Sequence, residues 1–323
     1  MYVSAIPVGG GGGHVFMYPL VPLCIHPQLL WLTPWVGLIF QNGVLLLISL
    51  ALSRSLLLLS GRWQAILLVS VSFFLSGLSV KQGDAPHWVK RVAVIPKIIV
   101  FLDPLTASLH VRQLIRTVLK DDPDVDIVVF PEGSFYCSTL CLSQKALGKL
   151  SEKHLGKKVH ILLGAFHQTD GKLYNTLIHV HNGILNDVFH KRQCLPLTEQ
   201  IPAYLAYDPI KQAYFNGVAS ISPSNNQREA FLLSGSLKVV PYICSEIFCN
   251  AHPDDKEGTE TIVSICNDFW FFYPKRLPYI PDLMVKCAQL KAIAWRRPVL
   301  YCSFFKAGYI SPSGHLRPIN RGK

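Results

Sequence analysis

The sequence predicts an α/β domain that follows an N-terminal helical membrane segment. Charge is the first observation: between residues 15 and 80 only Arg54 and Arg62 are charged, whereas residues 81–323 have the mixed composition of an ordinary soluble domain. The second observation is that β-branched runs alternate with helical periodicity in this later part, which is typical of α/β domains. We therefore place the boundary near residue 80, with a membrane segment at 1–80.

The membrane segment contains two stretches close to the ~20 apolar residues that a spanning helix needs. These are Trp35–Leu52 and Trp63–Val80, while Val15–Trp31 is broken by prolines and favours a re-entrant or interfacial segment. Arg54 and Arg62 lie between the two better spans, and the positive-inside tendency puts that connection in the cytoplasm. We expect a multi-pass protein of the bacterial inner membrane whose following domain faces the periplasm. The alternative is that these stretches are buried core helices.

The first elements of the domain follow from residue type and spacing. Runs of β-branched residues predict strands at Arg91–Ile95 and Ile98–Leu102. Apolar residues at helical spacing predict a helix at Thr106–Lys120. The turn signal Asp-Asp-Pro-Asp then precedes a short strand at Asp126–Phe130.

The alternation of helices and strands continues to the C-terminus, which predicts a sheet or pair of sheets with helices packed outside. The expected elements are a helix at Ser143–His154, strands at His160–Ala165, Thr176–His181, Leu237–Ile243 and Thr261–Cys266, a helix at Asp282–Trp295, a strand at Pro298–Ser303 and a hairpin turning at Ser311–Gly314.

The formal net charge of +11 has two interpretations. It suits a domain beside anionic lipid headgroups, and it equally suits a basic surface without a special role. The basic residues occur in scattered small groups, with neither a zinc-finger spacing nor an aromatic RNA-binding signature. We therefore predict no nucleic-acid partner.

The nine cysteines are an odd number, so they cannot all pair in internal disulfides. Most lie in apolar contexts, as Cys266 and Cys287 do, where a free cysteine behaves as a small core residue. Candidate metal ligands, Cys137 with Cys141 or Cys244 and Cys249 with His252, lack the paired spacing of structural zinc sites. We predict neither a metal nor a cofactor.

Polar residues that follow predicted strands are the candidates for chemistry, because functional groups gather at the carboxyl ends of strands in α/β sheets. Glu132 follows Val-Val-Phe-Pro, Cys244 follows Val-Val-Pro-Tyr-Ile, and Asn267 and Asp268 follow Val-Ser-Ile-Cys. Taken singly, each could equally be a loop or core residue.

The surrounding segments resemble motifs of the carbon–nitrogen hydrolase (nitrilase) superfamily, in the order found in that superfamily. Val128–Ser134 resembles its glutamate motif, Tyr174–Val180 with His190–Glu199 its lysine motif, Tyr242–Phe248 its cysteine motif, and Ser264–Phe271 the strand beyond. The resemblance extends from about Arg91 to Leu316. It implies a nitrilase-type four-layer α-β-β-α sandwich with Glu132, Lys191 and Cys244 as a catalytic triad.

The resemblance implies acyl transfer through a thioester on Cys244. A thiol attacks a carbonyl as thiolate, so it needs a base, which would be Glu132. Lys191 would supply a fixed positive charge that favours the thiolate and the oxyanion of the tetrahedral intermediate.

Supporting roles also follow from the resemblance. Glu199 would support Lys191, and Glu246 would order the loop after the nucleophile. Trp270 and Phe271 belong to an aromatic cluster that would line a substrate pocket, although such residues are also common in cores.

The membrane segment indicates the branch of the superfamily. Apolipoprotein N-acyltransferases carry this domain after transmembrane helices, and conjugative-transfer TraB proteins carry it on a membrane stem. The former have more such helices, another after the domain, and tyrosine where Ser245 stands. These differences favour a TraB-like or specialised relative, with a membrane lipid as acyl donor and an amine-bearing acceptor, which could be a lipoprotein.

Two alternatives stay open at this point. The chain could hydrolyse the carbon–nitrogen bond of a small amide, with the membrane segment serving location only. It could also be a conjugation or assembly factor that keeps the fold while catalysis is secondary or lost.

Overall fold

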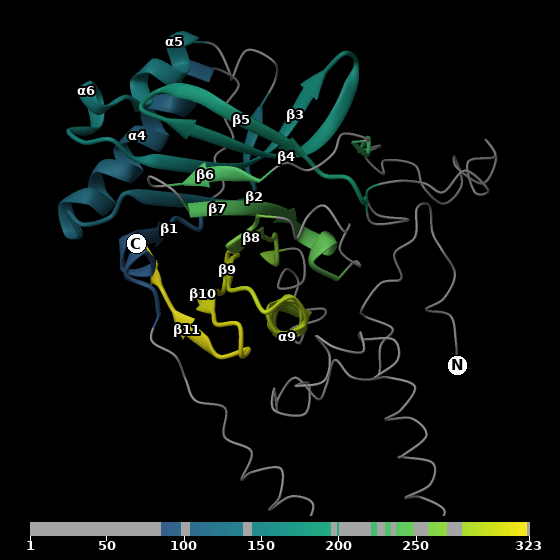
Figure 1. Ribbon diagram of the computed structural model, residues 1–323. Helices are drawn as coiled ribbons and strands as arrows, with labels where there is room; N and C mark the ends of the chain where they lie inside the picture. Colours follow the sequence, from purple (N-terminus) through teal and green to yellow (C-terminus); the bar gives the residue numbers. More distant parts are fainter. Residues whose placement is uncertain are drawn as a thin grey trace, which may run out of the picture.

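Two six-stranded sheets packed face to face form the body of the protein in the computed structural model (Figure 1). The structure describes residues 85–97, 104–137, 144–194, 199, 221–224, 230–233, 237–248, 258–269 and 280–321. Among the helices of these ranges, none is both long and apolar enough to cross a membrane. The expected membrane segment 1–80 and the expected strand Ile98–Leu102 lie outside the described residues.

The first sheet has the strand order β12-β1-β2-β3-β4-β5. Strands β12, β1, β2 and β3 run parallel, and β4 and β5 continue the sheet as antiparallel neighbours. A short 3-10 helix, η4 (His87–Arg91), leads into it. The strands are β1 (Val92–Val94), β2 (Ile127–Cys137), β3 (His160–Thr169), β4 (Lys172–His181), β5 (Ile184–His190) and β12 (Asn320–Arg321).

The second sheet has the order β11-β10-β9-β8-β7-β6. Its central strands β7, β8 and β9 are parallel, whereas β6, β10 and β11 pair antiparallel at the two sides. The chain then crosses to the first sheet to form β12 beside β1, which links the two sheets at the C-terminus. The strands are β6 (Phe231–Leu233), β7 (Leu237–Ile243), β8 (Thr261–Ile265), β9 (Val299–Cys302), β10 (Ala307–Ile310) and β11 (Leu316–Pro318).

Helices cover the outer side of each sheet, so the described part has four layers, as the motif resemblance implies (Figure 1). Helices α4 (Pro104–Asp121), α5 (Gln144–Leu147) and α6 (Glu152–Leu155) pack on the first sheet, and α9 (Ile280–Trp295) packs on the second. Three apolar layers fill the spaces: one between α4–α6 and the first sheet, one between the sheets, and one between the second sheet and α9.

The helical spacing of apolar residues explains α4. Val111, Ile115 and Val118 recur on one face and are buried against the first sheet. The expected helix at Thr106–Lys120 is thereby confirmed. The hairpin expected to turn at Ser311–Gly314 is also confirmed, since β10 and β11 flank that turn.

The single helix expected at Ser143–His154 is wrong. The segment instead forms α5, a 3-10 turn η6 (Gly148–Leu150) and α6. Ser151 has extended backbone angles (φ −77°, ψ 162°) and separates η6 from α6. A serine at such a position favours the start of a new helix over continuation of the old one.

Candidate active site

Glu132 lies inside a bulge of β2, not after the end of that strand as the sequence indicated. Phe130 pairs with Leu163 and Phe135 with Ala165, so the residues from Pro131 to Ser134 stand opposite the single residue Gly164 on β3. A bulge bends its strand and redirects the side chains within it, and such irregularities are frequent beside active sites.

Two glycines make room for this bulge. A Cβ on Gly164 would lie 2.2 Å from the carbonyl oxygen of Pro131 and 2.6 Å from the Cα of Glu132, so only glycine fits there. Gly133 has φ +67°, and a Cβ there would crowd Phe166 and Asn267. The backbone of β3 can therefore approach Glu132 closely.

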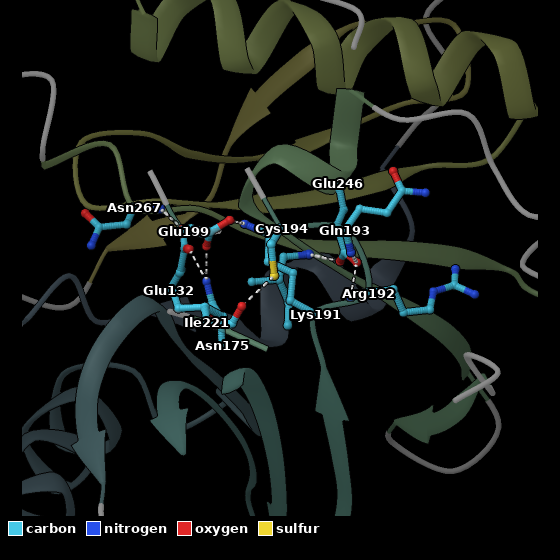
Figure 2. Close-up of polar contacts among 11 residues, drawn as sticks. Glu132, Asn175, Lys191, Arg192, Gln193, Cys194, Glu199, Ile221, Glu246 and Asn267 are labelled. Carbon is cyan, nitrogen blue, oxygen red and sulfur yellow. Dashed lines mark hydrogen bonds and ion pairs between the residues drawn. The ribbon is translucent and has the colours of Figure 1, made fainter. Parts of the chain in front are cut away.

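The Glu132 carboxylate is buried and held at both oxygens (Figure 2). Oε1 accepts a hydrogen bond from Asn175 Nδ2 at 2.6 Å, and Oε2 accepts one from the backbone N–H of Asn267 at 2.7 Å. The Cys244 side chain lies near Glu132, and the two groups affect each other's pKa. Residues of β2 and β4 and of the segments that follow β7 and β8 thus meet at this carboxylate.

Cys244 is the first residue after β7 and begins the 3-10 helix η8 (Cys244–Phe248). Its φ of +53° lies in the left-handed region that residues other than glycine rarely adopt. The sharp turn presents Cys244 at the carboxyl end of β7, where it stays partly accessible while Glu132 and Lys191 are buried.

Lys191 follows β5 directly and is fully buried. Its Nζ donates to Oε2 of Glu199 at 2.6 Å, and its backbone N–H donates to the carbonyl of Asn175 at 2.7 Å. A buried ammonium is stable only when it is paired and hydrogen-bonded, so Glu199 gives Lys191 the partner that its position requires.

Burial and the charges of neighbouring groups together determine the protonation of the site. Burial raises the pKa of Glu132, with Lys191 opposing this and Glu199 adding to it. Burial also raises the pKa of the Cys244 thiol well above its ordinary value, and the charge of Glu132 raises it further against the pull of Lys191. Burial disfavours the charged ammonium of Lys191, but the negative charges of the Cys244 thiolate, when it forms, and of Glu199 and Glu132 raise its pKa above the ordinary value. Lys191 is therefore a permanent cation, and Cys244 keeps its proton until Glu132 accepts it.

Glu246 joins the segment that carries Lys191 to the turn that carries Cys244. One carboxylate oxygen accepts from the backbone N–H groups of Arg192 at 2.7 Å and Gln193 at 3.3 Å. The other accepts from the backbone N–H of Ile243 at 2.9 Å. A buried carboxylate that accepts several backbone N–H groups fixes both segments relative to each other.

Cys194 is a second thiol near the site. Its Sγ donates to the carbonyl of Ile221 at 3.7 Å. Burial, with a contribution from Glu199 and against the opposing effect of Lys191, raises the pKa of this thiol to about 12. Cys194 is partly buried, and its hydrogen bond goes to a backbone carbonyl, which cannot take up the thiol proton.

Of the residues expected at the site, Glu132, Lys191, Cys244, Glu199 and Glu246 lie together, while Trp270 and Phe271 lie outside the described residues. Within the described chain, no group of three or more histidine, cysteine or acidic residues is arranged to hold a metal ion.

The sequence reading assigned no role to Asn175, and it noted Asn267 only as a residue at a strand end. Asn175 donates to both Glu132 and Glu199. Asn175 lies in the segment that resembles the lysine motif, and this was the signal available in the sequence. The sequence does not indicate the direction of its side chain.

Asp268, in the segment that follows β8, has a structural role instead. Its carboxylate accepts from Ser303 Oγ at 2.6 Å and from the backbone N–H groups of Phe304 and Phe305. Burial raises the pKa of Asp268, against these hydrogen bonds. The aspartate thereby holds the turn after β9.

Comparison with known proteins gives similarity in structure only. No family model matches the chain, and no curated protein matches it in sequence. It is similar to a carbon-nitrogen hydrolase from Helicobacter pylori G27, with 13% identity over 73% of this chain and 88% of the other, and a TM-score of 0.47. A nitrilase-superfamily member of branch 10 from Saccharomyces cerevisiae is similar at 16% identity, over 72% and 86%, with a TM-score of 0.48.

A third similar structure is an amidase of the nitrilase superfamily from Nesterenkonia AN1, solved as a mutant, with 11% identity, coverage of 75% and 90%, and a TM-score of 0.49. Because all three TM-scores lie below 0.5, the functional argument rests on the residues of this chain.

Proposed function

We propose that the protein is a nitrilase-type enzyme that attacks an amide or ester carbonyl with Cys244 and transfers the acyl group through a thioester. The observation that carries this proposal is the placement of Cys244, a partly buried residue at the end of β7, near the buried carboxylate of Glu132 and the buried cation Lys191. A nucleophile, a base and an oxyanion-stabilising cation are the groups that acyl transfer requires.

The first half of the reaction makes the thioester. The Cys244 thiol gives its proton to Glu132 while sulfur bonds to the carbonyl carbon, and Lys191 stabilises the negative oxygen. When this intermediate collapses, the bond to the leaving amine or alcohol breaks, and the leaving group takes the proton back from Glu132. The pKa values of Cys244 and Glu132 are both raised. This favours direct transfer of one proton between the two groups and disfavours a resting state in which both are charged.

The second half releases the acyl group. Glu132 accepts a proton from the incoming amine or water as it bonds to the thioester carbon. The intermediate then expels the Cys244 sulfur, which recovers a proton from Glu132. The product is an amide when the acceptor is an amine and a carboxylic acid when the acceptor is water.

For donor and acceptor we propose a membrane lipid and an amine, such as that of a lipoprotein. The support is the composition of residues 15–80, where only Arg54 and Arg62 are charged, since such a segment would hold the domain beside lipid at the inner membrane. A TraB-like role in conjugation would use the same chemistry on another acceptor.

Hydrolysis of a small amide is the second candidate. The observation that favours it is the charged and polar character of the groups near the thiol, since Glu132, Lys191 and Glu199 all act on Cys244. Water and a small amide match such surroundings better than a long acyl chain does.

One experiment separates the two. The full chain in detergent is incubated with labelled phospholipid or with short-chain amides, and the Cys244 peptide is examined by mass spectrometry. An acyl adduct from phospholipid that is absent in Cys244→Ala supports the lipid donor, whereas ammonia release from amides supports hydrolysis. If neither donor gives an adduct or ammonia, the proposed chemistry is wrong and a non-catalytic assembly role gains support.

A further inference from the structure

Asn175 occupies a central place in the site that the chemistry above does not use. It lies on β4, fully buried, and its Nδ2 donates to Glu132 Oε1 at 2.6 Å and to Glu199 Oε1 at 3.0 Å (Figure 2). A side-chain amide has two N–H groups, so each carboxylate receives one. The nitrogen must face the carboxylates, because the amide oxygen would repel both.

The backbone of Asn175 contributes a third contact. Its carbonyl accepts the N–H of Lys191 at 2.7 Å, and the Lys191 side chain bonds to the second oxygen of Glu199 at 2.6 Å. One residue therefore touches both carboxylates and the backbone of the cation between them. Removing its side chain would loosen the two carboxylates together.

The opposite end of the amide indicates what the residue is for. Asn175 Oδ1 is buried and has no hydrogen-bond partner among the described residues. Leaving such an oxygen unpaired is unfavourable, and a residue chosen for stability alone would avoid it. The position of Asn175 is thus explained by its two bonds to Glu132 and Glu199.

We propose that Asn175 is a positioning residue that holds Glu132 ionised and oriented toward Cys244 while it keeps Glu199 on Lys191. This inference rests on the proposed function. Without the amide, Glu132 keeps the backbone N–H of Asn267 as a donor but loses the one that it shares with Glu199. Glu132 then binds a proton more readily and loses its capacity as a base near neutral pH.

The test is the pH dependence of Cys244 alkylation by iodoacetamide, followed by mass spectrometry of the Cys244 peptide in the full chain. Asn175→Leu keeps the size of the side chain and removes its donors. We expect the lower inflection of the pH profile to move upward by about one unit, which lowers alkylation near neutral pH up to about tenfold. Asn175→Ser, which can donate only one bond, should give an intermediate shift and serves if the leucine variant fails to fold.

The matched control is Thr176→Val, which removes a buried hydroxyl from the neighbouring position of β4. That hydroxyl bonds to the His190 ring at 2.9 Å and not to Glu132. The inflection should stay at its wild-type pH in this variant. A wild-type profile in a folded Asn175→Leu or Asn175→Ser variant, or an equal shift in Thr176→Val, would overturn the positioning role.

Alkylation needs no substrate, so this test fails separately from the proposed function. If wild-type protein forms an acyl adduct but Asn175→Leu leaves the alkylation profile unchanged, the positioning role is wrong and the thioester chemistry stands. If no substrate acylates Cys244, the proposed function is wrong, whatever the alkylation profile shows.

Discussion

Cys244 combines a reactive side chain with a backbone conformation that suits glycine. Its φ of +53° carries an energetic cost of about 1–2 kcal/mol for a residue with a Cβ. The turn is held by Glu246, which accepts the N–H of Ile243 just before it. Backbone strain of this kind persists where surrounding contacts overdetermine it, and it is concentrated at functional sites.

This strain predicts an unusual order of stability for two inactive variants. Glycine normally lowers stability relative to alanine, but at a positive φ it removes the clash of the Cβ. We expect Cys244→Gly to be more stable than Cys244→Ala by about 1 kcal/mol in urea denaturation. A free energy of unfolding higher for the alanine variant would show that the left-handed turn is not a property of the folded protein.

Individual residues also show where sequence reasoning succeeded and where it stopped. Glu132, Lys191 and Cys244 lie far apart in the sequence, and the motifs around them were enough to group them. The network that orients them was not visible, because Asn175 acts through a side-chain direction that only the register of β4 with β3 and β5 fixes. Trp270 and Phe271 remain predictions.

At the scale of elements, the bulge in β2 and the glycine opposite it place Glu132 in the site. Gly164 has no room for a Cβ, because the nearest atoms belong to the backbone of Pro131 and Glu132 and cannot rotate away. Any larger residue would push β2 from β3 at the position of the base.

Gly164→Ala should therefore lower both activity and stability. We expect at least about 2 kcal/mol of destabilisation from overpacking and a loss of acyl transfer of roughly 10²-fold, because a displacement near 1 Å is enough to misplace a catalytic group. Thermal unfolding and the rate of Cys244 acylation measure the two effects.

Gly148→Ala is the matched control, since a Cβ there meets nothing within 4 Å. Both properties should stay close to those of the wild type. Equal effects of the two substitutions would contradict the close approach of β3 to the Glu132 backbone.

Element boundaries were predictable where periodicity is long and failed where the structure depends on pairing. The helix at Thr106–Lys120 and the strand at Leu237–Ile243 match α4 and β7. Strand β5, which carries Lys191 at its end, was not predicted because Ile-Leu-Asn-Asp-Val-Phe-His has neither a clear alternation nor an apolar run. It exists because β4 offers it an antiparallel partner.

At the scale of the whole molecule, histidines packed within the first sheet make stability depend on pH. Burial lowers the pKa of His160 to about 4, assisted by the charges of His181, His179 and Arg91. Burial also lowers the pKa of His190 to about 4, with a contribution from His167. Both rings are therefore neutral in the folded protein at a pH where an unfolded chain protonates them.

The sign of the effect follows from proton uptake. Between pH 6.5, the ordinary value, and about 4, the unfolded chain binds more protons than the folded one, so acid favours unfolding. We expect the urea midpoint, measured in one detergent throughout, to fall steadily as pH decreases through this range. The opposing carboxylate is Asp187, which bonds to His179 at 2.7 Å and limits the loss at that ring.

Substitution of His160 tests the assignment to this cluster. His160→Gln should reduce the loss of stability between pH 6.5 and 4, because one ring that resists protonation is gone. His110→Gln replaces an exposed histidine of α4 and should leave the pH dependence as in the wild type. A profile that is flat in the wild type, or equally reduced by both substitutions, would contradict this account.

The four-layer arrangement could be expected only from the motif resemblance. The alternation of helices and strands by itself does not decide between one sheet and two. The two-sheet arrangement depends on the crossing of the chain at β12 and on the apolar layer between the inner faces of the sheets. These contacts join segments more than two hundred residues apart, from β1 to β12, and local pattern carries no information on such pairing.

The rate at which an acyl donor forms a thioester on Cys244 tests the central claim most directly. With wild-type protein and either an amide or a phospholipid donor, mass spectrometry should find the acyl group on the Cys244 peptide and none on Cys194. Glu132→Gln, which keeps the shape of the side chain but cannot accept the thiol proton, should form the adduct about 10²–10⁴-fold more slowly. An adduct that forms in Glu132→Gln at the wild-type rate, or one that appears on Cys194 instead, would contradict the account.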